Sequence, residues 1–232
     1  MGRRRKGIPI DGWRNIDKPQ GMTSNQVLGR VRRALSAQKL GHAGTLDPLA
    51  TGILPIALGE ATKTIQFAQD RDKVYRFTIT WGESRNTDDS EGEVTATSAK
   101  RPTAADIAAL IPRFLGEIEQ IPPQFSAIKI DGERAYDLAR AGENIEMKSR
   151  IVTVYDMTLQ ATTPDTATFE LVCGKGTYVR SIARDMGKIF GCFGYISALR
   201  RLAVGNFSEE TSISLDEFEK IVLSSDPDRY LL

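Results

Sequence analysis

Hydrophobic and polar positions alternate with two different periods along the chain. Apolar residues recur at helical intervals over 27–35, behind a capping box formed by Thr23 and Gln26. In Lys73–Trp81, by contrast, every second residue is aromatic or aliphatic. The first segment therefore predicts an amphipathic helix, and the second predicts a half-buried strand.

Later segments repeat these two patterns. Ile151–Leu159 and Thr166–Cys173 predict the strands of a hairpin around the turn at 163–165. Further helices are predicted after Thr103 with Asp106, over Ala135–Ala141, from Gly176-Thr177 to about Met186 with an end at Gly187, and after Ser214 with Glu217. Because strands and helices mix without a regular βαβ rhythm, the fold class predicted is α+β with a largely antiparallel sheet.

Length and composition describe an ordinary globular protein. The chain has 232 residues, of which 41% are hydrophobic and 26% are charged, enough for one large domain or one domain with a small appendage. No uncharged stretch approaches the ~20 residues that span a bilayer, and no apolar core of a signal peptide follows the basic start. We therefore expect a cytoplasmic protein without a membrane partner.

Metal and cofactor chemistry finds little support in the residue counts. Cys173 and Cys192 lie far apart, and His42 is the single histidine of the sequence. These residues do not supply a zinc ligand set, and no cluster of acids is typical of a magnesium site. The phosphate-binding and serine-hydrolase motifs are missing from the sequence too. We expect no metal and no cofactor.

Charge is distributed unevenly along the chain. Residues 1–40 carry ten Lys or Arg against two Asp, whereas residues 205–232 carry a net charge of −5. This gradient indicates a polyanionic partner for one face, and Arg30, Arg32 and Arg33 could follow phosphates. A solvated helix face and a solvated N-terminal arm explain the same pattern.

One segment stands out for its chemistry. Residues 41–52 read GHAGTLDPLATG, with one histidine, one acid and no basic residue. Glycines allow the backbone to approach a ligand closely, and Pro48 disfavours a helical conformation at Asp47. A carboxylate on such a loop can act as a nucleophile or a base, although Asp47 could also merely cap a turn.

This segment and five others resemble the TruB family of bacterial tRNA pseudouridine synthases. The stretch GHAGTLDPLATGILPIALGEATK is similar to the catalytic motif of that family. The other similar segments, in order, are DKPQGMTS at 17–24, KVYR at 73–76, PPQFSAIK at 122–129, GKGTYVRS at 174–181 and LRRL at 199–202. The match runs from about Gly12 to Phe207.

The resemblance implies the pseudouridine synthase fold, with a mixed, largely antiparallel central sheet, flanking helices and an RNA-binding cleft. It also implies a domain organisation. A basic arm covers residues 1–11, the catalytic domain covers 12–210 with a thumb region at about 121–150, and a helical segment covers 211–232. The small RNA-binding domain called PUA, with which the family normally ends, is expected to be missing.

The same resemblance assigns catalytic roles to three residues. It implies that Asp47 is the nucleophile, that Tyr75 stacks on the target base and is a candidate to move a proton, and that Arg180 pairs with Asp47. A neighbouring guanidinium favours the ionised form of a carboxylate and holds it by a charge-assisted hydrogen bond.

Substrate-binding roles are implied as well. Tyr178 and Leu199 would line the uracil pocket, and Lys18 would bind the substrate. His42 would fill the gap left by the extruded base, since a planar ring recovers part of the cost of base flipping by stacking. Taken without the family, the two tyrosines are more often core or interface aromatics, and Leu199 is a core residue.

The activity implied is an isomerase that converts uridine 55 to pseudouridine in the T-arm loop of tRNA, as a monomer. Whether Asp47 attacks the sugar or the base is left open. Two alternatives are a synthase that acts on ribosomal RNA and an RNA chaperone that folds tRNA. A chaperone role could also accompany catalysis.

Overall fold

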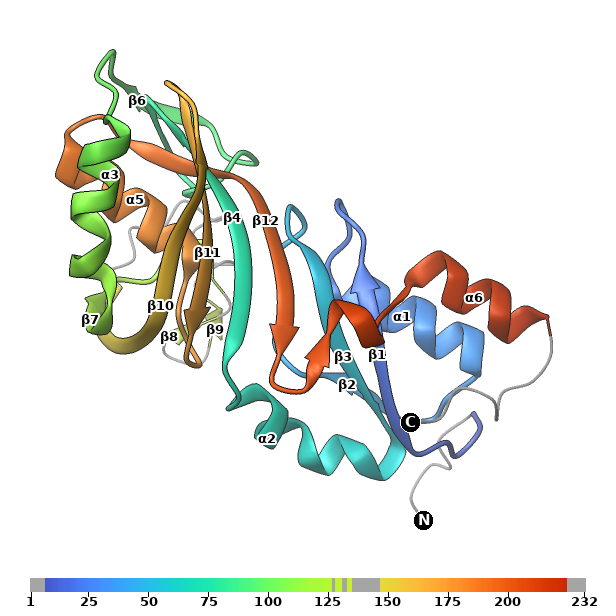
Figure 1. The fold of residues 1–232 in the computed structure, drawn as a ribbon. Coiled ribbons are helices and arrows are strands. Elements are labelled where there is room, and N and C mark those ends of the chain that lie inside the picture. Colours follow the sequence, from blue (N-terminus) through green and yellow to red (C-terminus); the bar gives the residue numbers. More distant parts are fainter. Residues whose placement is uncertain (1–6, 127, 131–132, 135–146, 225–232) are drawn as a thin grey trace. The chain divides into compact units, whose positions relative to one another are not determined.

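The computed structural model describes residues 7–126, 128–130, 133–134 and 147–224. The chain divides into two compact units (Figure 1). Unit one comprises Met1–Tyr75 and Leu199–Leu232, and unit two comprises Arg76–Ala198. The helix predicted over Ala135–Ala141 and most of the basic arm lie outside the described residues.

The sheet of unit one is built around strand β3 (Thr51–Leu58). Strand β1 (Gly12–Lys18) pairs with it antiparallel along its whole length, and the short β2 (Leu40–His42) lies antiparallel on its other side. Strand β12 (Gly194–Val204) runs parallel to β3 at two residue pairs. Two short strands complete this sheet: β13 (Phe207–Ser208), antiparallel on β12, and β14 (Ile213–Ser214), parallel to β1.

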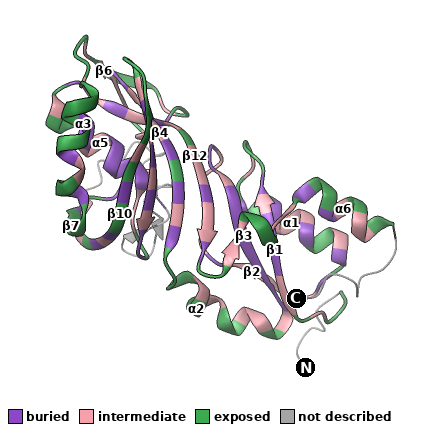
Figure 2. Cartoon of the chain, viewed as in Figure 1, coloured by how far each residue is buried: buried purple, intermediate pink, exposed green. Residues whose placement is uncertain are grey.

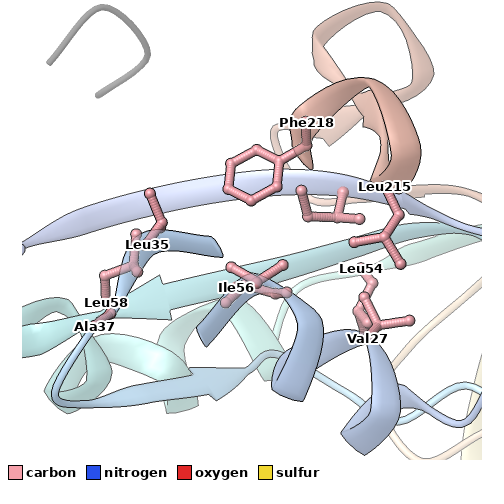
Figure 3. Packing of buried hydrophobic residues seen from close by; sticks show 10 residues of the cluster. Val27, Leu35, Ala37, Leu54, Ile56, Leu58, Leu215 and Phe218 are labelled. Carbon is pink, nitrogen blue, oxygen red and sulfur yellow. The ribbon is translucent and has the colours of Figure 1, made fainter. Parts of the chain in front are cut away.

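Helices α1 (Ser24–Leu35) and α6 (Leu215–Leu223) supply the hydrophobic core of unit one. Residues 52–58 of β3 are buried without interruption (Figure 2). The buried stripe of α1 and the side chains Leu215 and Phe218 of α6 pack on one face of this strand, at Leu54, Ile56 and Leu58 (Figure 3). A 3₁₀ turn (Gly59–Thr64) and the short α2 (Ile65–Gln69) follow β3, and a second 3₁₀ turn (Glu209–Thr211) precedes β14. A strand that is apolar on both faces thus forms the centre of this unit.

An ion-pair cluster also joins α1 to α6. Nε of Arg30 donates to Oε1 of Glu219 at 2.7 Å, and its Nη2 donates to Oδ1 of Asp216 at 2.9 Å. Arg32 and Arg33, in the last turn of α1, remain exposed. Part of the basic front of the sequence is therefore paired with the acidic tail of the same chain.

Unit two holds a second group of strands, ordered β4 (Lys73–Trp81, of which residues 76–81 belong to this unit), β11 (Thr166–Cys173), β10 (Arg150–Thr162) and β7 (Gly116–Gln120). The pairs of β10 with β11 and β7 are antiparallel, and the Phe77 and Phe169 rings stack at 5.3 Å. The remaining elements are β5 (Glu83–Arg85), β6 (Val94–Thr97), α3 (Ala104–Leu110), a 3₁₀ turn (Ile111–Phe114), β8 (Lys129–Ile130), β9 (Glu133–Arg134) and α5 (Val179–Phe190).

Most of the predicted elements are confirmed. The capping box predicted at Thr23 forms, and the predicted helix after Thr103 begins with a capping box as well. The Ser214 hydroxyl accepts from the Glu217 N–H at the start of α6. Lys73–Trp81 is a strand with alternating burial, and the hairpin runs over 150–173, with its first strand longer than predicted. The fold is α+β with a mixed, largely antiparallel sheet, as predicted. None of the described helices is long and apolar enough to span a membrane.

The predicted bounds of α5 are wrong. The helix begins after Tyr178 rather than at Gly176-Thr177, and it continues past Gly187 to Phe190. Its end is set by Gly191, whose φ of 65° is left-handed. Gly187 has a different purpose, because a Cβ there would lie 2.3 Å from the backbone nitrogen of Gly194. Gly187 lets the backbone of residues 193–194 pack closely against α5, and the helix does not end there.

We expect Gly187→Ala to lower the free energy of unfolding by about 1–3 kcal/mol, because the added methyl group overpacks a backbone contact. The matched control is Gly29→Ala in α1, where the nearest atom to a Cβ is the end of Arg33 at 3.7 Å. That change should stabilise the protein by about 0.5–1 kcal/mol. Urea unfolding of both variants measures the difference, and equal effects would contradict this explanation of Gly187.

Candidate active site

Asp47 lies on the loop of residues 43–50, which connects β2 to β3 and which we call the aspartate loop. The side chain of Asp47 is half-buried. Its backbone carbonyl accepts from the Ala50 N–H at 3.1 Å, so Asp47 begins a turn, and the Ala43 N–H donates to the Pro55 carbonyl at 2.9 Å. The start of the loop is thus hydrogen-bonded to β3, and its end forms a hydrogen-bonded turn.

Every second carbonyl of the aspartate loop from residue 44 to residue 50 accepts a hydrogen bond from outside the loop. The acceptors and donors are Gly44 with Arg201, Leu46 with Ser24, Pro48 with the N–H of Gly21 and with Lys18, and Ala50 with Lys18. These four carbonyls fix the aspartate loop to other parts of unit one along most of its length.

Ser24, the first residue of α1, holds the residue directly before Asp47. Its hydroxyl donates to the Leu46 carbonyl at 3.0 Å and accepts from the Leu46 N–H at 2.8 Å. Ser24 is buried, so both polar groups of Leu46 are satisfied away from water. The backbone directly before Asp47 is thereby fixed through both its N–H and its carbonyl group.

Lys18 holds the residues that follow Asp47. Its side chain is fully buried, and Nζ donates to the carbonyls of Ala50 at 2.6 Å, Pro19 at 2.8 Å and Pro48 at 3.4 Å. A buried ammonium needs such acceptors, because an unpaired buried charge is costly. These contacts favour a role in loop geometry. The predicted contact of Lys18 with the substrate stays a prediction.

Arg201, on β12, was not among the site residues predicted from the sequence. It is only 1% exposed. Its Nε donates to the Ile53 carbonyl at 2.7 Å and its Nη2 to the Gly44 carbonyl at 3.1 Å, so it joins the start of the loop to β3. The backbone approaches closely here, since a Cβ on Gly52 would lie 2.2 Å from the carbonyl oxygen of Arg201. The only sequence signal was the LRRL segment.

His42 ends β2, directly before the aspartate loop, and is half-buried. Burial lowers the pKa of this imidazole below its usual value, and the nearby charge of Arg201 lowers the pKa further. The ring is therefore neutral at physiological pH. A neutral planar ring can stack against a base, but the predicted place of His42 at the RNA stays a prediction.

Two other predicted residues lie in unit one. Tyr75, on β4, is only 9% exposed, and Leu199, on β12, is half-buried. Each stands where its strand passes from one unit to the other in the sequence. Their predicted contacts with the target base stay predictions.

Arg180 lies in the first turn of α5, in unit two, with a side chain 5% exposed. Its Nη1 donates to the Thr87 carbonyl and its Nη2 to the Phe125 carbonyl, each at 2.8 Å. Oδ2 of Asp89 is 3.7 Å from Nη1. These contacts fix the guanidinium in one orientation. The predicted pairing of Arg180 with Asp47 stays a prediction.

Tyr178 directly precedes α5 and is held at both backbone groups. Its N–H donates to the Gln120 side chain at 2.8 Å, and its carbonyl accepts from the same amide at 3.1 Å. The Arg150 guanidinium carbon lies 4.7 Å from the centre of the Tyr178 ring, a cation–π contact. The ring is half-buried, which leaves part of it available to a ligand.

Within the described ranges, no three His, Cys, Asp or Glu side chains are placed to hold a metal ion.

Comparison with known families gives the class of this protein. Residues 32–179 match a family model described as the N-terminal domain of TruB family pseudouridylate synthases, and residues 180–232 match one described as the C-terminal domain of tRNA pseudouridylate synthase B. The chain is thus a pseudouridylate synthase, which is an isomerase. Within that class, it belongs to the TruB family.

Relatives cover nearly the whole chain. A Brucella anthropi protein named tRNA pseudouridine synthase B is 55% identical over 223 residues, which are 95% of this chain and 69% of the relative. The protein of that name from Caulobacter vibrioides is 54% identical over 95% of this chain and 72% of its own. That from Rhodospirillum rubrum is 55% identical over 93% and 70%, respectively.

Solved structures with the same fold are more distant. A chain in a Cbf5–Nop10–Gar1 complex has a TM-score of 0.71 and 29% identity, covering 90% of this chain and 54% of that one. A chain in an archaeal box H/ACA sRNP Nop10–Cbf5 complex has a TM-score of 0.69 and 25% identity, covering 96% and 60%. The present chain therefore spans less than two thirds of these solved chains.

The environment of His42 gives a testable pH dependence. Because its pKa is lowered in the folded protein, the unfolded chain binds the proton more tightly, so stability should fall as pH drops below about 6.5. Arg201→Met should raise the pKa of His42. His42 is the single histidine, so one imidazole resonance in an NMR titration reports it directly. An unchanged midpoint in a folded Arg201→Met variant would contradict the assigned influence of Arg201.

Proposed function

We propose that this protein converts uridine 55 to pseudouridine in the T-arm loop of tRNA, in the cytoplasm. The names of its relatives support tRNA as the substrate. The observation that carries the proposal is the aspartate loop, which presents one half-buried carboxylate on a backbone held at alternate carbonyls. Hydrogen bonds to the backbone hold such a loop in place, so the reactive side chain stays available for the substrate.

The reaction is an isomerisation that needs no oxidant. The bond between C1′ of the ribose and N1 of uracil breaks, and a bond forms between C1′ and C5. The proton on C5 leaves, and N1 takes up a proton. In this scheme Asp47 is the nucleophile, directed at either C1′ of the ribose or C6 of the base.

The other residues would bind and orient the flipped nucleotide. Tyr75 would stack on the base and is a candidate to move the proton, and Tyr178 and Leu199 would line the uracil pocket. The neutral ring of His42 would occupy the space that the flipped base leaves. Arg180, which would pair with Asp47, has a guanidinium already oriented by two backbone carbonyls. These roles follow the family resemblance.

We expect Asp47→Asn to abolish turnover while RNA binding survives, because an amide of nearly the same shape is a far poorer nucleophile. Release of tritium from C5-labelled uracil in a T-arm stem-loop measures turnover, and filter binding measures affinity. The matched control is Asp165→Asn, at an exposed aspartate of the hairpin turn in unit two. Pseudouridine formed by carefully purified Asp47→Asn would contradict the role of Asp47.

The substrate is tested with the same assay on three RNAs. Whole tRNA and the isolated T-arm stem-loop should both release tritium, and a tRNA with cytidine at position 55 should not. Release from a ribosomal RNA fragment alone would favour the ribosomal alternative. Refolding of misfolded tRNA by Asp47→Asn would show an accompanying chaperone activity.

A further inference from the structure

Helix α5 carries two arginines one turn apart, Arg180 and Arg184, on its inner side. Both connect the same two segments of unit two. The first segment, residues 87–89, is here called the acidic turn. The second, residues 121–125, lies at the start of the thumb region and is called the thumb root. Arg180 reaches the acidic turn at Thr87 and the thumb root at Phe125.

Arg184 repeats this connection one turn further along the helix. Its Nη1 donates to Oδ2 of Asp88 at 3.1 Å, and its Nη2 donates to the Ile121 carbonyl at 2.7 Å. Its Nε donates to Oδ1 of Asp185 at 2.9 Å. The side chains of Arg184 and Asp88 are 16% and 12% exposed. The pair is therefore sheltered from solvent, where it is stronger than an exposed ion pair.

Further hydrogen bonds hold both segments, so a movement at Arg184 would reach the acceptors of Arg180. In the acidic turn, Asp88 has a left-handed φ of 61°, and the Thr87 hydroxyl donates to Oδ1 of Asp89 at 2.6 Å. In the thumb root, the Ile121 carbonyl accepts a second bond, from the Ser181 hydroxyl of α5, at 2.8 Å. A shift of either segment would move an acceptor of Arg180.

We propose that Arg184 is a positioning residue for Arg180, acting through its simultaneous hold on the acidic turn and the thumb root. The proposal rests on the catalytic role of Arg180 in the proposed function. Arg184 itself contacts no reacting atom in this scheme. It fixes the two segments whose carbonyls orient the Arg180 guanidinium, and a misplacement of about 1 Å in such a group can cost about 100-fold in rate.

The charges around Asp88 give this proposal a pH signature. Among the described residues, Arg180, Arg184 and Asp185 of α5 face Asp88, and Asp89 is its chain neighbour. Burial raises the pKa of Asp88 to about 6, although the two arginines oppose this. Asp88 is therefore ionised at neutral pH and loses its charge below about pH 6, where its bond to Arg184 weakens.

Activity and stability should respond to this proton in opposite directions. The folded protein binds the Asp88 proton more tightly than the unfolded chain, so this group adds stability as pH falls from about 6 towards about 4. The catalytic rate should fall over the same window, because the Arg184 contact is lost. Because His42 changes stability in the opposite direction over the same range, the contribution of Asp88 is read from the difference between wild type and Asp88→Asn.

The experiment measures single-turnover rates at saturating T-arm stem-loop, between pH 5 and 8. We expect Arg184→Met to reduce the rate about 10- to 100-fold at pH 7.5 with little change in RNA affinity, and Arg184→Lys to reduce it less. Asp88→Asn should lower the neutral rate and remove the limb near pH 6. The matched control, Arg101→Met, deletes an arginine that pairs with Asp165 at 2.8 Å elsewhere in unit two, and should behave as wild type.

Each result decides the proposal. A folded Arg184→Met or Arg184→Lys variant with the wild-type rate overturns it, as does an Asp88→Asn variant that keeps the limb near pH 6, which would then belong to another group such as His42. If Arg184→Met does not fold, the lysine and asparagine variants decide. Failure of the proposed function looks different: wild type itself forms no pseudouridine, or Arg180→Met is fully active.

Discussion

The structure of the active-site region depends on satisfying the backbone carbonyls of one irregular loop. The aspartate loop has no ladder partner over residues 43–50, so its inward carbonyls need donors from elsewhere. Ser24 and the Gly21 N–H supply some of these donors, and Lys18 and Arg201 supply the others as buried cations. These cations need the carbonyls equally, because their charges would be costly to bury alone. Each partner thus makes the burial of the other possible, and the pattern fixes where Asp47 stands.

The two units contribute different kinds of rigidity. In unit one, side chains from β1, α1 and β12 hold a loop by its backbone. In unit two, a helix holds two segments by a pair of arginines, and the second arginine pairs with an acid. Both arrangements orient a functional side chain through groups that do not themselves react. The two arrangements account for the burial of Lys18, Ser24, Arg180 and Arg201.

Features that depend on residues close in the sequence were predicted well, whereas contacts between distant residues were not. Thr23 with Gln26 and the alternation in Lys73–Trp81 depend on neighbours a few residues away, so the sequence displays them directly. Gly187 misled the prediction of α5, because a glycine near a helix end usually marks the stop, whereas here it makes room for the backbone of Phe193 and Gly194 just after the helix. Arg201 was missed because its contacts are distant in sequence. Its acceptors lie about 150 residues earlier, and a buried arginine in a strand contradicts the usual pattern.

The ion-pair cluster between α1 and α6 has a consequence for how RNA binding should respond to salt. Binding of a polyanion is driven largely by counterion release, and each cation that newly meets a phosphate adds to the slope of log K against log salt. Arg30 already has two carboxylates as permanent counterions within the molecule. Arg30 should therefore contribute little to that slope. The number of basic residues in 1–40 overstates the number of phosphates that they can neutralise.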